Sequence, residues 1–539
     1  MVHDSSDSIS SCCAASPLQL ERNLHTFKQV LRKAEIAYRL RYYAASAALC
    51  EVAALFAVAR HPGIFSSIQL EKILHNISAK IPPSDVNVAH LRANCSGRQS
   101  VLHVATQVRD TGGLSRMLYL WMTRDKERQH SLALTRQQNR PVPGPIDAAV
   151  KQSGGHIVAL DQHSKNLIDR AIQLRNLAAN FELVVLHVWN EDVVPSIAFS
   201  SCTDKPRVLF LDHADHMFWV GLFASDFFIS MRDSGMQLAR ERRGVDASRS
   251  LMLPIALEES QRSHARAAAK QILGYPKDSI IILSVARAVK FRTINGVSFA
   301  DAHVDVLKRH SNAYLVVVGA GDRKDWVPAI SSVNGRIHSY AETPDTKLFF
   351  EAADIYVDSF PFVSITSMLE AGLYGLPLVT RFPYDASMNQ ILGADAPGLR
   401  DHVIRAATID EYIFHVSRLV DNPTLRSDLG AAIRLGITNA HTGDLWMRNL
   451  EAIYSTAIDT PRSNHPLPTA GTDQFKADAP DIFLESAFGR AVSLDDLLRQ
   501  YNYGRYLPID ERLALACIQL SARAARKVRK IMHSGSQQE

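Results

Sequence analysis

The chain has 539 residues, of which 60 are Lys or Arg and 55 are Asp or Glu, giving a formal net charge of +5 at pH 7. This length exceeds what one hydrophobic core usually serves, so at least two domains are expected. With 46% hydrophobic and 21% charged residues, the composition is that of an ordinary soluble protein, and the mild charge without an RNA- or DNA-binding motif does not indicate a nucleic-acid-binding protein.

The cysteines and the start of the chain indicate a reducing compartment. The six cysteines are scattered, and no pair has the spacing of a metal site. Residues 1–16 are polar and acidic, without the basic and apolar regions of a signal peptide. The most apolar window, residues 42–59, includes Glu51 and barely reaches membrane-spanning length, so we interpret it as a buried helix. We therefore expect a cytoplasmic protein.

The first part of the chain has a helical pattern. Helix signals run over residues 18–40 and 42–60, and a third helix follows Ser66 and Ser67. No second copy appears at a fixed period, so we interpret this part as a helical extension rather than a repeat array. Residues 82–99 are polar and irregular, which predicts a linker.

Strands and helices then alternate. Strands are predicted at residues 101–106, 131–135, 156–159, 183–188, 207–211 and 225–230, with helices between them, notably at 117–124 and 164–179. This alternation is typical of a parallel sheet covered by helices, in which ligands bind beyond the carboxyl ends of the strands. Gly112 and Gly113 follow the first strand and allow positive φ and close approach of a ligand.

A polar loop, Asp212-His213-Ala214-Asp215-His216, follows the strand at 207–211. Three interpretations compete: a metal site, for which no third ligand has recognisable spacing; a histidine general base held by an aspartate; and a polar loop with local hydrogen bonds. Farther on, Arg240, Arg242 and Arg243 form a charge run that we expect to be a solvated face.

The second half repeats the alternation. A helix is predicted at residues 260–273 and strands at 279–285, 313–318 and 336–340. Three cations, Arg287, Lys290 and Arg292, follow the first of these strands, and a turn with Gly319 and Gly321 follows the second.

Residues 352–380 form the most informative unit: a strand at 355–357, a polar turn, a helix ending near Gly372 or Gly375, and a strand at 376–380. Ser364, Thr366 and Ser367 stand at the helix start, where free backbone N–H groups and the helix dipole favour an anion, most often a phosphate. Glu370 lies about one turn on and can reach a hydroxylated part of a ligand. The alternative is an ordinary βαβ unit with capping residues.

This unit resembles glycosyltransferases with two Rossmann-like domains, the GT-B type, in particular group 1 or family 4. Asp354, Ser359, Glu370, Ala371, Gly375, Pro377 and Val379 fall on the family pattern. Phe362 replaces the earlier of its two glutamates. The turn from Phe360 to Ser367 is also similar to the O-GlcNAc transferase group, which inverts, so retention and inversion both stay open.

The resemblance implies an α/β fold with two Rossmann-like domains facing a cleft and with helical N- and C-terminal extensions. The predicted units are a helical N-terminal extension (1–95), an acceptor domain (96–255), a donor-binding domain (256–440), a crossover helix (441–457), and a linker with a helical tail (458–539). The basic stretch at 523–530 is compatible with peripheral contact at the inner face of the membrane, but a solvated helix end is favoured.

The resemblance also assigns roles. It implies that Gly112, Gly113 and Arg116 form a loop facing the acceptor side of the cleft. A histidine ends the equivalent strand of the family, which favours the general-base interpretation, with His213 ahead of His216 and with Asp215 beside them. The predicted donor-binding residues are Arg287, Lys290, Arg292, Gly319, Gly321, Glu342, Ser364, Thr366, Ser367 and Glu370.

The expected activity is sugar transfer from a nucleotide-diphosphate sugar to a glycan, a lipid-linked glycan or a protein. Neither a metal nor a cofactor other than the donor substrate is expected, and no nucleic acid partner. The alternatives are a nucleotide-sugar epimerase or hydrolase of the same fold and a degenerate nucleotide-sugar-binding scaffold.

Overall fold

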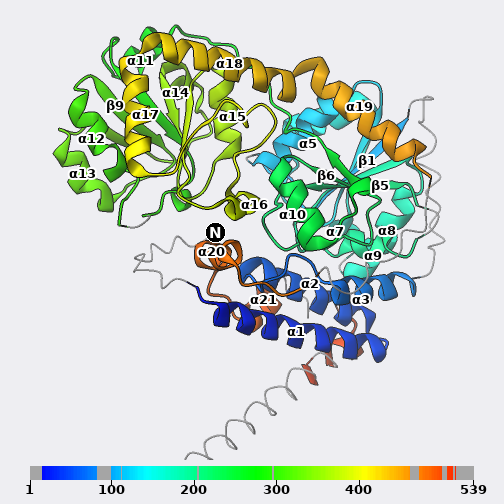
Figure 1. Ribbon diagram of the computed structural model, residues 1–539. Coiled ribbons are helices and arrows are strands. Elements are labelled where there is room, and N and C mark those ends of the chain that lie inside the picture. Colours follow the sequence, from blue (N-terminus) through cyan, green and yellow to red (C-terminus); the bar gives the residue numbers. More distant parts are fainter. Residues whose placement is uncertain are drawn as a thin grey trace, which may run out of the picture.

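The computed structural model describes residues 15–81, 99–110, 112–164, 166–202, 205–293, 296–461, 473–500, 507–513 and 516–517. Most of the predicted linkers at 82–99 and 458–475 and the basic stretch at 523–530 lie outside these residues. Figure 1 shows two α/β layers side by side, each made of one sheet and the helices that cover it. A helical layer lies beneath the one that comes first in the chain.

The first sheet has seven parallel strands in the order β3-β2-β1-β4-β5-β6-β7. The strands are β1 (Ser100–Ala105), β2 (Gln129–Leu134), β3 (Ile157–Ala159), β4 (Leu183–His187), β5 (Arg207–Asp212), β6 (Phe227–Ser230) and β7 (Ser250–Met252). The helices that follow its strands are α5 (Gly113–Arg124), α6 (Gly144–Ser153), α7 (Leu160–His163), α8 (Leu167–Ala178), α9 (Val194–Phe199) and α10 (Asp233–Arg243), with a 3-10 turn η1 (Ala247–Arg249).

The second sheet has six parallel strands in the order β10-β9-β8-β11-β12-β13. They are β8 (Ile280–Val285), β9 (Ala313–Val318), β10 (Ile337–Tyr340), β11 (Ile355–Val357), β12 (Leu378–Arg381) and β13 (Ile404–Ala406). Its helices are α11 (Arg266–Ile272), α12 (Asp301–Arg309), α13 (Val327–Ser332), α14 (Lys347–Ala352), α15 (Ile365–Leu373), α16 (Asn389–Leu392), α17 (Ile409–Asp421) and α18 (Pro423–His441), with 3-10 turns η2 (Ala288–Lys290), η3 (Lys324–Trp326) and η4 (Ala386–Met388).

The helix predicted over 260–273 is shorter than expected, because α11 begins only at Arg266. The segment before it is held by the end of α14 instead. The backbone N–H of Ser263 donates to Glu351 Oε1 at 2.6 Å, and Arg262 donates to the Glu351 carbonyl, also at 2.6 Å. These contacts compete with the i to i−4 hydrogen bonds that a longer helix would need.

The long helix α19 (Gly443–Asp459) returns from the second sheet to the first. Trp446, Leu450 and Tyr454 on α19 are buried in one cluster with Trp121 of α5 and with apolar residues of the first sheet. Figure 1 shows α18 and α19 spanning the two layers on one side. The two α/β layers are therefore connected by α18 and α19 on this side.

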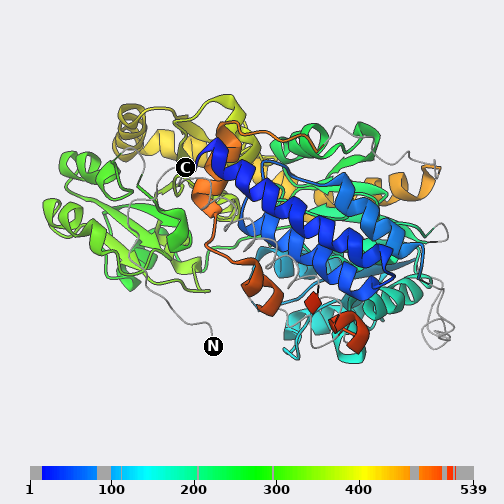
Figure 2. The same cartoon turned by 90° about the horizontal axis from the view of Figure 1, so that it is seen from below.

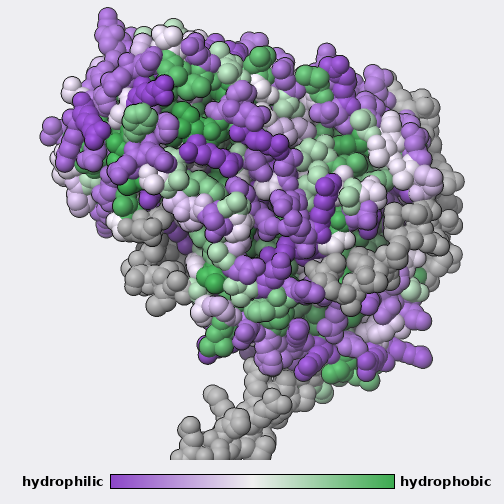
Figure 3. All heavy atoms as spheres, viewed as in Figure 1, coloured by the Kyte–Doolittle hydropathy of each residue, from purple (hydrophilic) through white to green (hydrophobic). Residues whose placement is uncertain are grey.

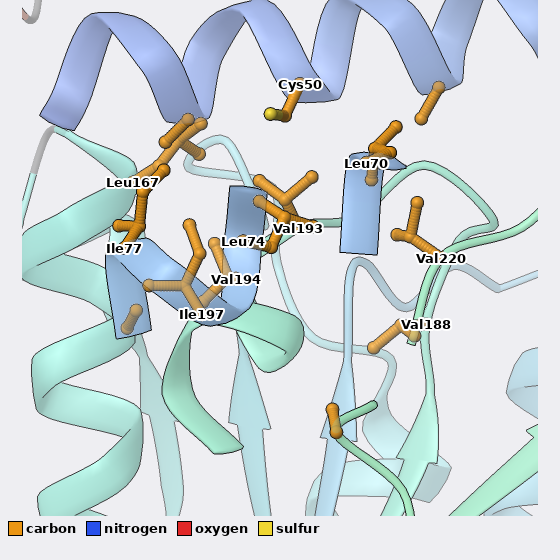
Figure 4. Packing of buried hydrophobic residues seen from close by; sticks show 14 of the residues in the cluster. Cys50, Leu70, Leu74, Ile77, Leu167, Val188, Val193, Val194, Ile197 and Val220 are labelled. Carbon is orange, nitrogen blue, oxygen red and sulfur yellow. The ribbon is translucent and has the colours of Figure 1, made fainter. Parts of the chain in front are cut away.

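The helical extension packs on the first sheet and its loops. It consists of α1 (Pro17–Arg39), α2 (Tyr43–Ala59) and α3 (Ile68–Ser78), to which the late helices α20 (Ala479–Phe488) and α21 (Leu494–Gln500) are added. Figure 2 shows α1 to α3 lying across the first sheet's layer. In Figure 4, Cys50 of α2 and Leu70, Leu74 and Ile77 of α3 face Val193, Val194 and Ile197 at α9.

The extension also fixes a loop of the first sheet through a buried carboxylate. Glu71 of α3 accepts hydrogen bonds from the backbone N–H groups of Gly221 at 2.6 Å and Leu222 at 3.0 Å. Burial raises the pKa of Glu71, and these N–H groups oppose the rise. Because this turn follows the polar loop at 212–216, the extension supports a segment at the carboxyl end of β5.

Among the helices described, none combines the length and the apolar character needed to cross a bilayer. Figure 3 shows a mostly hydrophilic face on which hydrophobic side chains form separate small areas.

Candidate functional site

Segments that follow the carboxyl ends of both sheets meet between the two layers. Arg116, in α5 after β1, bonds to Glu370, in α15 after β11. Arg232, directly after β6, donates to the carbonyls of Gln390 at 2.9 Å and Gly393 at 3.1 Å, which belong to α16 and the residue after it. In sheets of this kind ligands bind at these strand ends, so this junction is the candidate site.

The turn before α15 is built around a buried aspartate. Asp358 follows β11, is fully buried, and accepts the backbone N–H of Ser364 at 3.0 and 3.2 Å on its two oxygens. Ser364 Oγ lies 3.2 Å from Ser367 Oγ, and Thr366 and Ser367 are half-buried in the first turn of the helix. The residues predicted to bind phosphate therefore lie together at the N-terminus of α15.

Lys290 lies beside this turn. Its ammonium donates to the Val363 carbonyl at 2.8 Å. Burial lowers the pKa of Lys290, while Asp358 opposes the change. Conversely, burial raises the pKa of Asp358 to about 7, and Lys290 opposes that rise. Sequence reasoning missed Asp358, although its position at the end of a buried strand was a usable signal.

The two arginines of the same segment that were predicted to bind the donor differ in their exposure. Arg287 is exposed, whereas Arg292 is half-buried with its guanidinium 5.5 Å from the centre of the Phe362 ring. The backbone N–H of Arg292 donates to the Phe360 carbonyl at 3.2 Å, which ties the cationic segment to the turn before α15. Their predicted role in binding a diphosphate stays a prediction.

The glycine turn after β9 lies against the same cationic segment. Gly319 has φ +93°, and a Cβ there would lie 2.4 Å from the Ala286 carbonyl oxygen, so no larger residue fits. The N–H groups of Gly319 and Gly321 both donate to the Tyr340 carbonyl at 3.0 Å. Glu342, two residues beyond Tyr340, is exposed. The glycines thus join β9 to the end of β10, and Glu342 lies on the loop that continues from it.

Glu370 lines a cavity of about 390 Å³. The cavity is lined from both sides of the junction, by Arg116, Glu258, Ser260, Asp345, Glu370 and Tyr374 among others. Arg116 bonds to Glu370 and lies 3.6 Å from Glu258. A Cβ on Gly112 (φ +126°) or on Gly113 would meet no heavy atom within 4 Å, so the loop before α5 has open space beside it.

The polar loop after β5 has its two aspartates enclosed by arginines. Asp215 receives two hydrogen bonds from Arg232, at 2.6 Å from Nε and 2.9 Å from Nη2. Burial alone would raise the pKa of Asp215, but Arg232 and His216 outweigh it and hold the pKa well below its usual range. Burial raises the pKa of Asp212 although Arg243 lies 3.8 Å away.

The two histidines of this loop lie in different surroundings. Burial lowers the pKa of the half-buried His213 to about 4, against the opposing effects of the Leu211 carbonyl and Asp215. His216 has its Nδ1 3.5 Å from Asp215, and its ring centre is 5.5 Å from that of Phe488 in α20. The structure thus brings His213, Asp215 and His216 to the carboxyl end of β5, and their catalytic role stays a prediction.

The expectation that the arginine run at 240–243 is a solvated face is wrong for two of its members. Arg243 is fully buried and donates to the carbonyls of Asp215 at 2.5 Å and Met217 at 2.6 Å. Arg242 is buried against Asp481 of α20, at 2.8 Å. The last turn of α10 faces this loop and α20, so its cations satisfy buried oxygens instead of meeting water.

Phe362, which replaces the earlier family glutamate, holds the late helix α20. Its ring centre is 4.6 Å from that of Phe488 and 5.5 Å from that of Phe483. The polar side of α20 is fixed to the residues that follow α2, because Asp481 pairs with His61 at 2.9 Å and Glu485 pairs with Arg60 at 2.6 Å. An apolar contact therefore occupies the position where a carboxylate was expected from the family pattern.

No metal-binding arrangement is found in the described ranges, where no group of three or more His, Cys, Asp or Glu side chains has suitable geometry.

Comparison with known proteins gives likenesses of structure. No model of a known protein family matches the chain, and no curated protein sequence matches it. A glycosyltransferase from Rickettsia africae matches 68% of this chain and 100% of its own, with a TM-score of 0.51 at 12% identity. Anabaena HepE, solved with UDP, matches 67% of this chain and 100% of its own, with a TM-score of 0.50 at 12% identity.

At such low identity these likenesses establish the fold. Both solved structures match over their whole length. The predicted fold class is confirmed: the chain has the GT-B fold of glycosyltransferases, with two Rossmann-like domains facing a cleft and with helical extensions at both ends.

Proposed function

We propose that the protein is a glycosyltransferase that moves a sugar from a nucleotide-diphosphate sugar to a glycan, a lipid-linked glycan or a protein. The observation that carries this proposal is the turn before α15. It joins a helix N-terminus with hydroxyl residues, a nearby lysine, and Glu370 at the wall of a 390 Å³ cavity. The match to HepE, which was solved with UDP, supports a nucleotide as the class of ligand.

The donor diphosphate is proposed to lie at the N-terminus of α15. Backbone N–H groups and the hydroxyls of Thr366 and Ser367 donate to its oxygens, and the helix dipole adds positive potential. Lys290 already lies at this turn, with Arg287 and Arg292 on the same segment. As the glycosyl bond breaks, negative charge develops on the leaving diphosphate, and fixed donors of this kind stabilise it.

The nucleoside is proposed to lie along α15, in the cavity beside Glu370. The carboxylate of Glu370 accepts hydrogen bonds from both ribose hydroxyls, and the base reaches toward Glu342. In the structure, Arg116 donates a hydrogen bond to this carboxylate. Nucleotide binding therefore requires Arg116 to share or release Glu370, which links the donor site to the glycine loop of the other domain.

His213 is proposed as the general base that accepts the proton of the attacking hydroxyl. The pKa of His213 is lowered by burial, so its imidazole is neutral and able to accept a proton at neutral pH. With Phe362 in place of the earlier glutamate, position 362 of the donor turn offers no carboxylate. A base across the cleft favours inversion. Asp215, whose two oxygens are bound by Arg232, is proposed to position the loop.

The experiment that tests the donor site is Glu370→Gln, which keeps the size of the side chain and removes its charge. Hydrogen bonds to charged groups contribute ~1.5–3 kcal/mol, so the Kd for a nucleoside diphosphate should rise by about 10- to 150-fold. Loss of the partly exposed pair with Arg116 should cost no more than about 1 kcal/mol of stability. Isothermal titration calorimetry and a thermal melt measure the two effects.

Asp147→Asn is the matched control, because Asp147 is also a carboxylate paired with a cation, Lys151 at 2.7 Å, and is not among the residues that line the cavity. It should bind nucleotide like the wild type. Removing both ribose hydroxyls from the nucleotide should weaken binding to the wild type but add little to Glu370→Gln. If Glu370→Gln binds the ribonucleotide as tightly as the wild type, the proposed donor site is wrong.

Transfer is proposed to need no metal ion, because a helix terminus and cationic side chains already neutralise the diphosphate. Turnover of the best donor in a nucleotide-sugar panel should keep its wild-type rate after EDTA treatment and desalting. Complete loss of activity that Mn²⁺ or Mg²⁺ restores would contradict this.

A second candidate is a nucleotide-sugar-binding subunit without transferase activity. It is favoured by Phe362, which packs on α20 where the family pattern has a glutamate. A nucleotide-sugar epimerase or hydrolase of this fold would consume the donor without an acceptor. Thermal stabilisation by a nucleotide sugar without release of nucleoside diphosphate would identify the binding subunit, and release without an acceptor would identify the epimerase or hydrolase class.

A further inference from the structure

Three buried histidines lie side by side on neighbouring strands of the first sheet. His130 is on β2, His103 on β1 and His187 on β4, and each side chain is 0% exposed. The ring of Trp121 in α5 covers them, with its centre 5.9 Å from that of His103 and 5.5 Å from that of His187. Burial lowers the pKa of all three, so they are neutral at physiological pH.

The three imidazoles form one hydrogen-bonded series, called here the histidine chain. His130 Nε2 lies 2.9 Å from the Asp125 carbonyl oxygen. His130 Nδ1 lies 3.0 Å from His103 Nε2, and His103 Nδ1 lies 3.0 Å from His187 Nε2. The chain thus crosses three strands in the order β2, β1, β4.

The Asp125 end fixes the direction of every bond. A carbonyl oxygen only accepts, so His130 Nε2 carries a proton and donates it. A neutral imidazole has one donor and one acceptor nitrogen. His130 Nδ1 therefore accepts from His103 Nε2–H, and His103 Nδ1 accepts from His187 Nε2–H. His187 Nδ1 is left as an acceptor.

This last nitrogen is the open end of the chain. His187 Nδ1 is buried and has no hydrogen-bond partner among the residues that the structure describes. His187 ends β4, and the register of β4 with β5 pairs Leu186 with Phe210, which places His187 at the same edge as the residues after Asp212. His213 is close enough to lower the pKa of His187 further, beyond the effect of burial.

We propose that the histidine chain positions His213. When the ring of His213 turns toward it, His187 Nδ1 accepts a hydrogen bond from the one N–H of the neutral His213 ring, and the lone pair of the other His213 nitrogen stays available to the acceptor hydroxyl. The Leu211 carbonyl, near the end of β5, competes with His187 for this N–H, because it also favours a proton on the His213 ring. This inference rests on the proposed function for the role of His213 as base, and it makes His187 a positioning residue.

The physical advantage of such a chain is that it presents a hydrogen-bond acceptor, His187 Nδ1, at the end near the cleft. It does so without placing a buried charge there. An isolated carboxylate in place of His187 would have to be desolvated without a paired cation. In each imidazole, the nitrogen that carries the proton is set by the hydrogen bond that the other nitrogen makes. In a neutral series, the Asp125 carbonyl that fixes the proton of His130 on Nε2 therefore also fixes the protons of His103 and His187.

The first test needs no substrate. In protein labelled with ¹⁵N-histidine, NMR distinguishes the two neutral tautomers, and single variants assign the signals. His130, His103 and His187 should all carry their proton on Nε2, and His213 should show one tautomer. A proton on Nδ1 of any of the three chain histidines would reverse the direction and overturn the proposal, whether or not the variants below fold.

The second test changes the open end. His187→Phe removes the acceptor, whereas His187→Gln keeps an amide donor for His103 and a carbonyl acceptor for His213. The ¹⁵N shifts of His213 should move toward tautomer averaging in His187→Phe and should stay near wild type in His187→Gln. Unchanged His213 shifts in His187→Phe would overturn the proposal.

The third test is a double-mutant cycle on turnover of the best donor of the panel. His187→Phe should lower kcat by about 10- to 100-fold, as loss of a partner that orients an active imidazole does, with little change in KM. In a His213→Ala background it should have no further effect, because the group it positions is gone. The same fold-loss in both backgrounds would show a purely structural role and overturn the proposal. If the His213 shifts move but kcat does not, positioning stands and the role of His213 as base fails.

Discussion

His213→Ala is expected to lower kcat for sugar transfer by ~10²–10⁴-fold, since that is what a general base contributes when it accepts a proton in the transition state. The side chain is half-buried on the loop after β5 and belongs to none of the apolar clusters of the core. Its removal should therefore leave the melting temperature close to that of the wild type. Initial rates with the donor selected from the panel, together with a thermal melt, measure the two effects.

His216→Ala is the matched control for this prediction, because it removes the other imidazole of the same loop. His216 contacts Asp215 and the Phe488 ring, so a small loss through disturbed packing is expected. If kcat is unchanged in His213→Ala and falls steeply in His216→Ala, the base has to be reassigned to His216.

Asp215→Ala is expected to destabilise the protein by about 3–5 kcal/mol, because removing one partner of a buried ion pair leaves an uncompensated charge. Arg232 would stay buried among the carbonyls of Gln390 and Gly393 without its hydrogen-bonded carboxylate, and the remaining carboxylate, Asp395, lies 3.9 Å away. Asp215 is also packed tightly against α10, since a Cβ on Gly235 would lie 2.1 Å from Asp215 Oδ2. This pair therefore joins the loop after β5, the start of α10 and the residues around α16.

Urea unfolding measures the loss, with Asp147→Ala as control. Asp147 pairs with Lys151 at 2.7 Å, but their side chains are 40% and 72% exposed, so its removal should cost less than about 1 kcal/mol. The pKa of Asp215 is held low in the folded protein. Its contribution is thus complete above the unfolded pKa of about 3.9 and is lost as the pH falls through the folded pKa. Equal losses for Asp215→Ala and Asp147→Ala at pH 7 would contradict the buried-pair interpretation.

The sequence by itself determined the elements of the fold and their order. The helices α1 to α3 and the alternation of strand and helix were predicted close to their observed bounds, because hydrophobic period and capping residues are local signals. The unit from β11 to β12 was predicted in the same way, and with it the grouping of Ser364, Thr366 and Ser367 at a helix start. The GT-B fold followed from a resemblance in this unit and was confirmed.

What the tertiary structure alone decided concerns partners that are far apart in the sequence. The sequence pattern predicts that Arg243 is part of a charged, solvated run. In the structure it is fully buried, because α10 packs against the loop after β5. Arg116 and Glu370 are separated by 254 positions and meet across the cleft. Neither pairing leaves a periodic signal, since a hydrogen bond between elements depends on how those elements pack.

The histidine chain shows the same limit. His103, His130 and His187 are single polar residues in three apolar strands, and each one alone reads as an isolated buried histidine. Only the strand order β2-β1-β4 makes them neighbours, and only the contact with the Asp125 carbonyl gives the series a direction. Strand order and side-chain contact arise from packing over the whole chain, whereas a sequence pattern reports the few residues within its own period.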